Sequence, residues 1–180
     1  VIDETDEEVR WDGHLAARLP FALEWRYSGG NNPLVRPGAW AETDLAWPAE
    51  LPPKIKALAQ QITKNEQTAD QRANAIAKYL KSHCQYSLDK GPLPKGMDPV
   101  EQFLFHTRSG HCELYASAMV ILARACSIPA RFVAGFVIVQ RNPMTGLWLA
   151  RERHAHAWCE CLIPGEGWTI FDPTPGSAAF

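Results

Sequence analysis

Cys112 stands at a position where a thiol can become a nucleophile. The stretch around it reads RSGHCELYASA over residues 108–118, so an apolar, alanine-rich run of helical character begins at the cysteine. Unpaired N–H groups and the macrodipole at a helix N-terminus lower the pKa of a thiol, and a neighbouring imidazole lowers it further. Gly110 is expected to leave room for a substrate to approach the sulfur. Taken alone, however, a cysteine that starts an apolar helix is more often buried and inert.

A histidine and a carboxylate later in the chain complete a set that suits thiol catalysis. His156 lies in a segment with period-two alternation, and Trp158 shares its face and is expected to shield the pair from water. Asp172 ends the next predicted strand, where Pro173 breaks pairing and frees the carboxylate. A cysteine is activated by a base that a third group orients. The order along the chain is therefore nucleophile, base and orienting acid.

The turn between these two strands decides which face Asp172 occupies. A tight turn over residues 164–167 places Asp172 opposite Cys159, on the wrong face of the sheet. His156 and Asp172 share a face when the register shifts so that the two stand about opposite each other. We therefore predict a looser loop over about residues 162–166, or a bulge.

Two other histidines compete for the role of base. His154 is expected on the same strand face as His156, so it is an alternative base, although a place at the rim of the site suits it better. His111 adjoins Cys112 in sequence, and the geometry of a helix turns neighbouring side chains away from each other. His156 is the stronger candidate because it lies inside a strand.

Four runs of helical spacing lead up to and include the cysteine. They occupy residues 53–62, 68–83, 98–107 and 111–128. Thr68 and Gln71 form a capping-box pattern, and Asp98 is an N-cap placed before Pro99. Pro129 is expected to end the last helix.

The pattern changes after residue 129, where β-branched and aromatic residues predict strands. The expected strands occupy residues 130–140, 147–153, 154–163 and 168–172. Helices followed by an antiparallel sheet form an α+β layout, with the Cys112 helix packed on the sheet. We assign residues 54–180 to this core and the Trp- and Pro-rich residues 1–53 to a segment or linker that packs on it.

Composition limits the classes of function. The 180 residues are 46% hydrophobic and 21% charged, as in ordinary globular domains. A net charge of −2 gives no electrostatic footprint for nucleic acid, so no nucleic-acid partner is expected. No apolar run approaches the roughly 18 residues of a membrane span. The chain opens at Val1 without a methionine, and we expect it to be a piece of a longer protein.

Five cysteines leave at least one thiol outside any intrachain disulfide, and no C-x-x-C pair is present. Cys126, Cys159 and Cys161 are expected to be small core residues. A zinc site of Cys159, Cys161 and a histidine is an alternative, but strand alternation puts these cysteines on the face opposite His156. No metal and no cofactor are expected.

Three stretches together resemble the transglutaminase-like superfamily of papain-like thiol enzymes, above all its bacterial transglutaminase-core domains. They read DPVEQFLF at residues 98–105, SGHCELYASAMVILARACSIPARFVAGF at 109–136 and HAHAWCECLIPGEGWTIFDPT at 154–174. The resemblance covers roughly residues 45–176. It implies the papain-like, transglutaminase-core fold, with Cys112 as nucleophile, His156 as general base and acid, and Asp172 as the residue that orients His156.

The same resemblance implies acyl transfer from a glutamine carboxamide, through a thioester on Cys112, to an amine such as lysine. With water as acceptor the enzyme is instead a cysteine peptidase or amidase, and a non-catalytic binding module is a third hypothesis. The expected partner is a protein or peptide that carries a glutamine side chain. By resemblance, the parent is a bacterial protein anchored in the inner membrane, with this segment outside the cytoplasm.

Some features of the family have no counterpart in this chain. The tryptophan that helps to bind the oxyanion in the animal enzymes has no clear equivalent. The backbone N–H of Cys112 is a natural donor in its place, with Tyr86 as a second candidate. Calcium is not carried over, because no carboxylate-rich loop of the kind that binds it is present.

Overall fold

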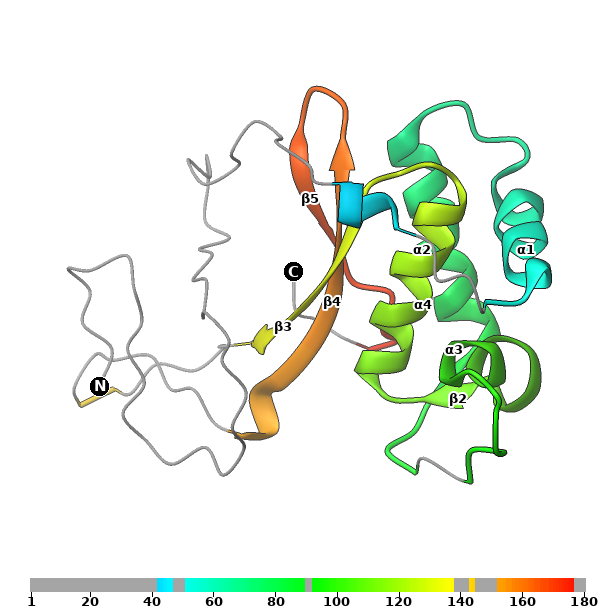
Figure 1. The fold of residues 1–180 in the computed structure, drawn as a ribbon. Helices are drawn as coiled ribbons and strands as arrows, with labels where there is room; N and C mark the ends of the chain where they lie inside the picture. Colours follow the sequence, from blue (N-terminus) through cyan, green and yellow to red (C-terminus); the bar gives the residue numbers. More distant parts are fainter. Residues whose placement is uncertain (1–41, 47–50, 90–91, 138–142, 145–151, 177–180) are drawn as a thin grey trace. The chain divides into compact units, whose positions relative to one another are not determined.

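The computed structural model describes residues 42–46, 51–89, 92–137, 143–144 and 152–176 (Figure 1). The chain divides into two compact units, residues 1–34 with 135–155 and residues 35–134 with 156–180. Most of the expected N-terminal segment 1–53 and of the expected strand 147–153 lies outside the described residues.

Helices precede the main sheet along the chain. The helices are α1 (Pro53–Thr63), α2 (Ala69–His83), α3 (Pro99–Gln102) and α4 (Cys112–Ala125). Short helical turns are η1 (Glu42–Leu45), the π-helical η2 (Phe103–Thr107) and η3 (Glu152–His154). The strands are β1 (Gln85–Tyr86), β2 (Ser109–Gly110), β3 (Ala130–Phe136), β4 (Ala155–Ile163) and β5 (Gly167–Phe171). The predicted α+β class is confirmed.

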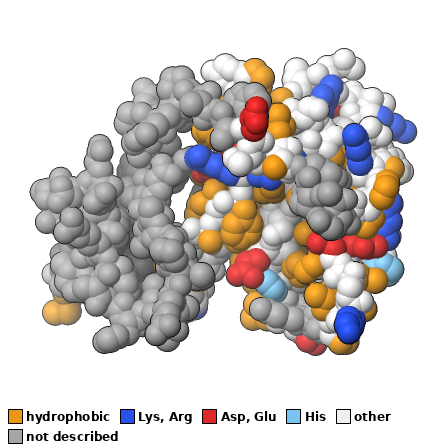
Figure 2. Space-filling view, in the orientation of Figure 1, with side chains coloured by type: hydrophobic (Ala, Val, Ile, Leu, Met, Phe, Trp, Pro, Cys, Tyr) orange, Lys and Arg blue, Asp and Glu red, His pale blue; other side chains and the backbone are white. Residues whose placement is uncertain are grey.

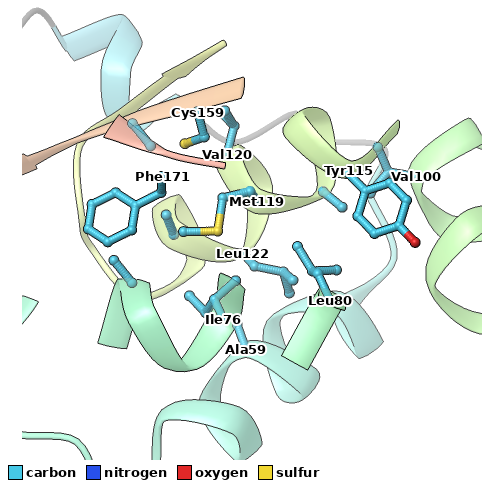
Figure 3. Close-up of a cluster of buried hydrophobic side chains, with 14 of the residues drawn as sticks. Ala59, Ile76, Leu80, Val100, Tyr115, Met119, Val120, Leu122, Cys159 and Phe171 are labelled. Carbon is cyan, nitrogen blue, oxygen red and sulfur yellow. The ribbon is translucent and has the colours of Figure 1, made fainter. Parts of the chain in front are cut away.

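Helices α1, α2 and α4 pack against one another and form one layer. The predicted apolar stripes are their buried faces, because Ile55 and Ala59 of α1 and Ile76 and Leu80 of α2 are completely buried. In Figure 3, side chains of α2 face Leu122 of α4 across the core. Burial of these faces, rather than helix propensity, stabilises helices of this length.

The predicted helix starts are confirmed by their hydrogen bonds. The Thr68 hydroxyl accepts the N–H of Gln71 at 3.2 Å, and the Gln71 side chain accepts the N–H of Thr68 at 3.1 Å. One Asp98 oxygen accepts the N–H groups of Val100 and Glu101 at 2.8 and 3.1 Å. Each cap satisfies donors that have no partner within their own helix.

Helix α4 ends earlier than the proline signal predicts. Its last residue is Ala125, and Ser127 then adopts a left-handed conformation with φ of 60°. The N–H of Ile128 donates to the carbonyl of Ala123 at 3.0 Å, which closes the helix end before Pro129 is reached. The proline therefore follows the end of the helix and does not cause it.

The predicted packing of α4 on the sheet is also confirmed. The sheet has the order β3-β4-β5, and β4 and β5 run antiparallel. Met119 and Val120 of α4 belong to the same buried cluster as Cys159, Cys161 and Phe171 of the sheet (Figure 3). Cys159 and Cys161 are completely buried, as expected for small core residues.

A second, two-stranded sheet holds the segment that leads into α4. Strands β1 and β2 pair in parallel, with Gln85 beside Ser109 and Tyr86 beside Gly110. Arg108 precedes β2 in a left-handed conformation, with φ of 49°, which ends the π-helical turn η2. The chain that reaches Cys112 is therefore fixed by α3 and η2 on one side and by β1 on the other.

Candidate active site

Cys112 is the first residue of α4, as predicted, and it is half-buried. His111 is the N-cap, and its carbonyl accepts the N–H groups of Leu114 and Tyr115 at 3.0 and 3.3 Å. The Nδ1 atom of His111 lies 3.6 Å from a carboxylate oxygen of Glu113. The His111 imidazole is thus engaged beside Glu113.

Hydrogen-bond donors around the sulfur lower the pKa of the Cys112 thiol below its usual value. The hydrogen bond with His156 is the largest cause, and it outweighs the opposing effect of burial. The backbone N–H groups of Ala157 and Glu113 and the charge of the imidazole add to the shift. Each of these groups favours the thiolate, which is the reactive form of cysteine.

The ring of His156 bridges the thiol and a carboxylate. Its Nε2 atom lies 2.8 Å from Oδ2 of Asp172, so Nδ1 is the ring nitrogen left for the hydrogen bond with Cys112. The bond with Asp172 is the main cause that raises the pKa of His156 to about 9, followed by the bond with Cys112. Both stabilise the imidazolium, so thiolate and imidazolium form a pair.

Asp172 is held from two sides. Oδ1 accepts the backbone N–H of Thr174 at 2.9 Å, and Oδ2 bonds to His156. The Asp-Pro-Thr stretch therefore forms a side-chain turn, and the same carboxylate orients the imidazole. The side chain of Asp172 is only 7% exposed, which limits competition from water for these bonds.

The strand register brings the two residues to one face. Cys159 pairs with Phe171, so Asp172, which directly follows β5, continues the register to a place opposite Trp158. His156 and Asp172 are then diagonal neighbours on the same face. The predicted shared face is confirmed, although Asp172 stands one diagonal step away from His156 and not opposite it.

A short loop sets this register. Ile163 pairs with Gly167, which leaves only Pro164–Glu166 as the loop, shorter than predicted. The N–H of Glu166 donates to the carbonyl of Ile163 at 3.1 Å, and Gly165 has φ of 85°. Proline followed by a residue with positive φ is the pattern of a type II turn. With three loop residues, rather than two or four, Asp172 lies on the same face of the sheet as His156.

The three additional candidate residues, Trp158, Tyr86 and His154, have different surroundings in the structure. Trp158 stacks beside His156, with ring centroids 6.3 Å apart and an interplanar angle of 26°. Burial, and then the charge of Cys112, raise the pKa of the Tyr86 phenol, so it stays a hydrogen-bond donor near the sulfur. The predicted strand start at His154 is one residue early, because His154 lies in the 3₁₀ turn η3 and β4 begins at Ala155; its expected place at the rim of the site stays a prediction. Strand alternation therefore does not extend to it.

Gly110 has a packing role that differs from the expected one. A Cβ atom on this buried glycine would lie 2.5 Å from Cδ1 of Leu114 and 3.3 Å from the ring of Phe103. The space beside Gly110 is thus filled by the protein's own side chains and is not left for a substrate.

Gly110→Ala is therefore expected to lower the free energy of unfolding by about 1–3 kcal/mol, because the overpacked methyl must displace Leu114 or the backbone. Chemical denaturation measures the change, with Ser109→Ala as the neighbouring control. Equal stability of the two variants would contradict the packing role.

The pKa shifts of Cys112 and His156 predict how the reactivity of the Cys112 thiol depends on pH. Lowering the pH through the depressed pKa of Cys112 protonates the thiolate, and raising it through about 9 removes the proton of His156. Only a few per cent of an ordinary thiol is ionised at pH 7. Iodoacetamide is therefore expected to alkylate Cys112 at pH 7 at least about tenfold faster than an ordinary cysteine. Mass spectrometry follows the rate at each cysteine, with Cys126 as internal control. A Cys112 rate that rises only near pH 8.5, like an ordinary thiol, would contradict the ion pair.

Some contributors were not predicted from the sequence. They are the N–H groups of Ala157 and Glu113 at the sulfur and the N–H of Thr174 at the carboxylate. The Asp-Pro-Thr pattern does predict the contact with Thr174, because aspartate before proline commonly caps a turn. The contacts of Ala157 and Glu113 depend on how β4 packs against the start of α4, which no local sequence pattern predicts.

No metal site is seen in the described part of the chain: it holds no group of three His, Cys, Asp or Glu side chains suited to binding an ion. Cys159 and Cys161 have sulfurs 3.7 Å apart in the core. Among the described residues, no helix is long and apolar enough to cross a bilayer.

Comparisons with known sequences agree with the geometry. A family model described as the transglutaminase-like superfamily matches residues 56–173. A Pseudomonas aeruginosa protein named protein-glutamine gamma-glutamyltransferase is 34% identical over 177 residues, 96% of this chain and 26% of its own length. The uncharacterized protein YebA of Bacillus subtilis is 34% identical over 135 residues, 72% of this chain and 18% of its own length. The chain thus spans about a quarter or less of these two relatives.

Solved structures show the same fold. The periplasmic domain of TgpA from Pseudomonas aeruginosa aligns with a TM-score of 0.64 and 36% identity, over 72% of this chain and 45% of that one. A protein from Cytophaga hutchinsonii described as a candidate cysteine protease aligns with a TM-score of 0.50 and 25% identity, over 79% of this chain and 41% of that one.

Proposed function

The chain belongs to the transglutaminase-like superfamily, and from this premise we propose that it transfers the acyl group of a glutamine side chain to an amine through a thioester on Cys112. The observation that supports this most is the 2.8 Å hydrogen bond between His156 and Asp172, together with the interaction of the same imidazole with Cys112, which lowers the pKa of the thiol. A binding module without catalysis has no physical need for an ionised thiol held in this way.

The first half of the reaction forms the acyl-enzyme. The Cys112 thiolate attacks the carboxamide carbon of glutamine and forms a tetrahedral intermediate with a negative oxygen. His156 donates its proton to the departing nitrogen, which leaves as ammonia while the carbon–nitrogen bond breaks. The backbone N–H of Cys112 and the phenol of Tyr86 are the proposed donors to the oxyanion.

The second half releases the product. A primary amine, such as a lysine side chain, attacks the thioester carbon, and neutral His156 accepts the proton that the amine loses. The carbon–sulfur bond breaks, an isopeptide bond remains, and the thiolate–imidazolium pair is restored. Asp172 holds the ring in one orientation through both halves, and Trp158 is proposed to shield the ring from water.

The setting of the reaction is part of the proposal. Because the TgpA domain that this chain resembles is periplasmic, we place this chain outside the cytoplasm of a bacterial cell, as part of a larger membrane-anchored protein. Residues 54–180 form the catalytic core in this view, and residues 1–53 pack on it or link it to what precedes. The proposed substrates are glutamine-bearing proteins or peptides.

One assay separates this function from its alternatives. The chain is incubated with a glutamine-containing protein and a labelled primary amine, and amine incorporation and ammonia release are followed together. Incorporation supports the proposal. Ammonia or peptide release without incorporation supports a cysteine peptidase or amidase, the alternative that the likeness to the Cytophaga hutchinsonii protein favours. Inactivity, together with an unreactive Cys112, would leave only a binding module.

A further inference from the structure

Among the described residues, strand β1 is paired on only one of its two edges, the edge that faces β2. The N–H groups of Gln85 and Ser87 donate to carbonyls on the β2 side at 2.7 and 2.9 Å. In a strand, the backbone groups of successive residues point to opposite sides, so the N–H and carbonyl of Tyr86 point away from β2. Within the part of the chain that the structure describes, neither makes a backbone hydrogen bond. The other, free edge therefore offers one donor and one acceptor to another extended chain.

The side chain of Tyr86 in β1 lies near the reactive sulfur. Tyr86 pairs with Gly110, which precedes Cys112 by two residues. After burial, the charge of Cys112 is the second cause that raises the pKa of the Tyr86 phenol, so the two side chains share one environment. We therefore expect a peptide whose glutamine reaches Cys112 to contact β1.

Apolar side chains are exposed along the same stretch. Tyr86 is 47%, Leu88 74% and Leu93 49% exposed. In Figure 2, hydrophobic side chains reach the surface in the lower part of the molecule, where Figure 1 places the connection from β1 to α3. The side chain of Gln102 donates to the carbonyl of Pro92 at 2.9 Å, which fixes the far end of this connection. One exposed leucine is ordinary, whereas several exposed apolar side chains in one stretch, of which Tyr86 lies near Cys112, are consistent with a binding surface.

We propose that the acyl-donor peptide binds as an added strand on the free edge of β1, with an apolar residue near its glutamine packed on Leu88. Main-chain hydrogen bonds to Tyr86 hold the peptide, and alternation along a strand directs the glutamine and the residue two positions away to the same face. The substrate class is thus an extended segment in which glutamine has an apolar neighbour at that spacing. The inference rests on the proposed function, since it specifies how the same site holds its donor.

Backbone methylation of the donor tests the added strand. A blocked peptide with a central glutamine and leucine two residues to either side is compared with versions that carry one N-methyl group at each position in turn. Because the carbonyl of Tyr86 can accept only one N–H of the peptide, KM is expected to rise about five- to tenfold when that one position is methylated, with kcat unchanged. The other positions serve as matched controls.

A change of side chain tests the apolar contact. Leu88→Ser is expected to raise KM for the leucine-containing peptide by about tenfold and to leave kcat unchanged. It should have no effect on a peptide with serine in place of both leucines. Phe132→Ser, which removes a 44% exposed apolar side chain from β3, is the matched control.

The outcomes separate this inference from the function on which it rests. Acyl transfer with a KM that responds neither to the position of the methyl group nor to Leu88 overturns the strand-addition proposal and leaves the proposed function in place. Strand addition is also overturned, and the proposed function again left in place, if a glutamine amide without flanking residues reacts with the same KM as the peptide. No transfer from any donor, with Cys112 resistant to alkylation, overturns both.

Discussion

Cys112→Ala is expected to reduce acyl transfer by at least about a thousandfold. The sulfur is the atom that forms the thioester, and nothing in an alanine side chain replaces it. Helix α4 keeps its start, because the N-cap contacts are made by the carbonyl of His111 and not by the thiol. The measurement is incorporation of a labelled amine into a glutamine-containing protein.

The matched control is Cys126→Ala. Cys126 is also half-buried, and it follows the other end of the same helix, where its sulfur lies 3.4 Å from the hydroxyl of Thr63. It is expected to keep full activity with a small loss of stability. If Cys112→Ala retained more than a few per cent of the activity while circular dichroism showed a folded protein, Cys112 would not be the nucleophile.

Asp172→Asn is expected to lower kcat/KM by about 10²- to 10⁴-fold, with the fold retained. An asparagine oxygen can still accept the N–H of Thr174, so the turn after β5 persists. The negative charge beside His156 is lost, however, and the bond with Asp172 is the main cause that raises the pKa of that imidazole to about 9. The histidine pKa should fall, and the alkaline limb of the pH–rate profile should move to lower pH.

A second capping aspartate provides the control for this variant. Asp98 accepts two backbone N–H groups at the start of α3 and contributes to the fold in a similar way. Asp98→Asn is expected to leave kcat/KM and the pH–rate profile unchanged, with thermal unfolding close to that of Asp172→Asn. An Asp172→Asn enzyme with the unchanged alkaline limb would show that the carboxylate does not set the state of His156.

Local signals were enough to predict the helices. The capping box of Thr68 and Gln71 and the cap at Asp98 act within three residues, so their chemistry can be recognised without knowledge of distant contacts. The apolar stripes of α1 and α2 are set by the helical period and became the buried faces. The end of α4 was predicted less well, because the left-handed conformation of Ser127 carries no strong residue signal.

The predicted start of strand β4 at His154 was one residue early for a related reason. Alternation of residue types suggested that the strand begins at this histidine, whereas β4 begins at Ala155 after a 3₁₀ turn. Backbone hydrogen bonds with a neighbouring strand define where a strand starts, and these are contacts between distant parts of the chain. Period-two alternation can therefore locate a strand but not its first residue.

By itself, the sequence determined the types of the three candidate catalytic residues, their order along the chain and the helix on which the thiol stands. Only the tertiary structure decided that His156 and Asp172 meet, because the three-residue loop Pro164–Glu166 sets the register and a shift by one residue would turn the carboxylate to the other face. It also decided that the N–H of Ala157 reaches the sulfur and that β1 lies beside the approach to Cys112. These arrangements join segments far apart in sequence, and their energies come from packing and hydrogen bonds that no local pattern contains.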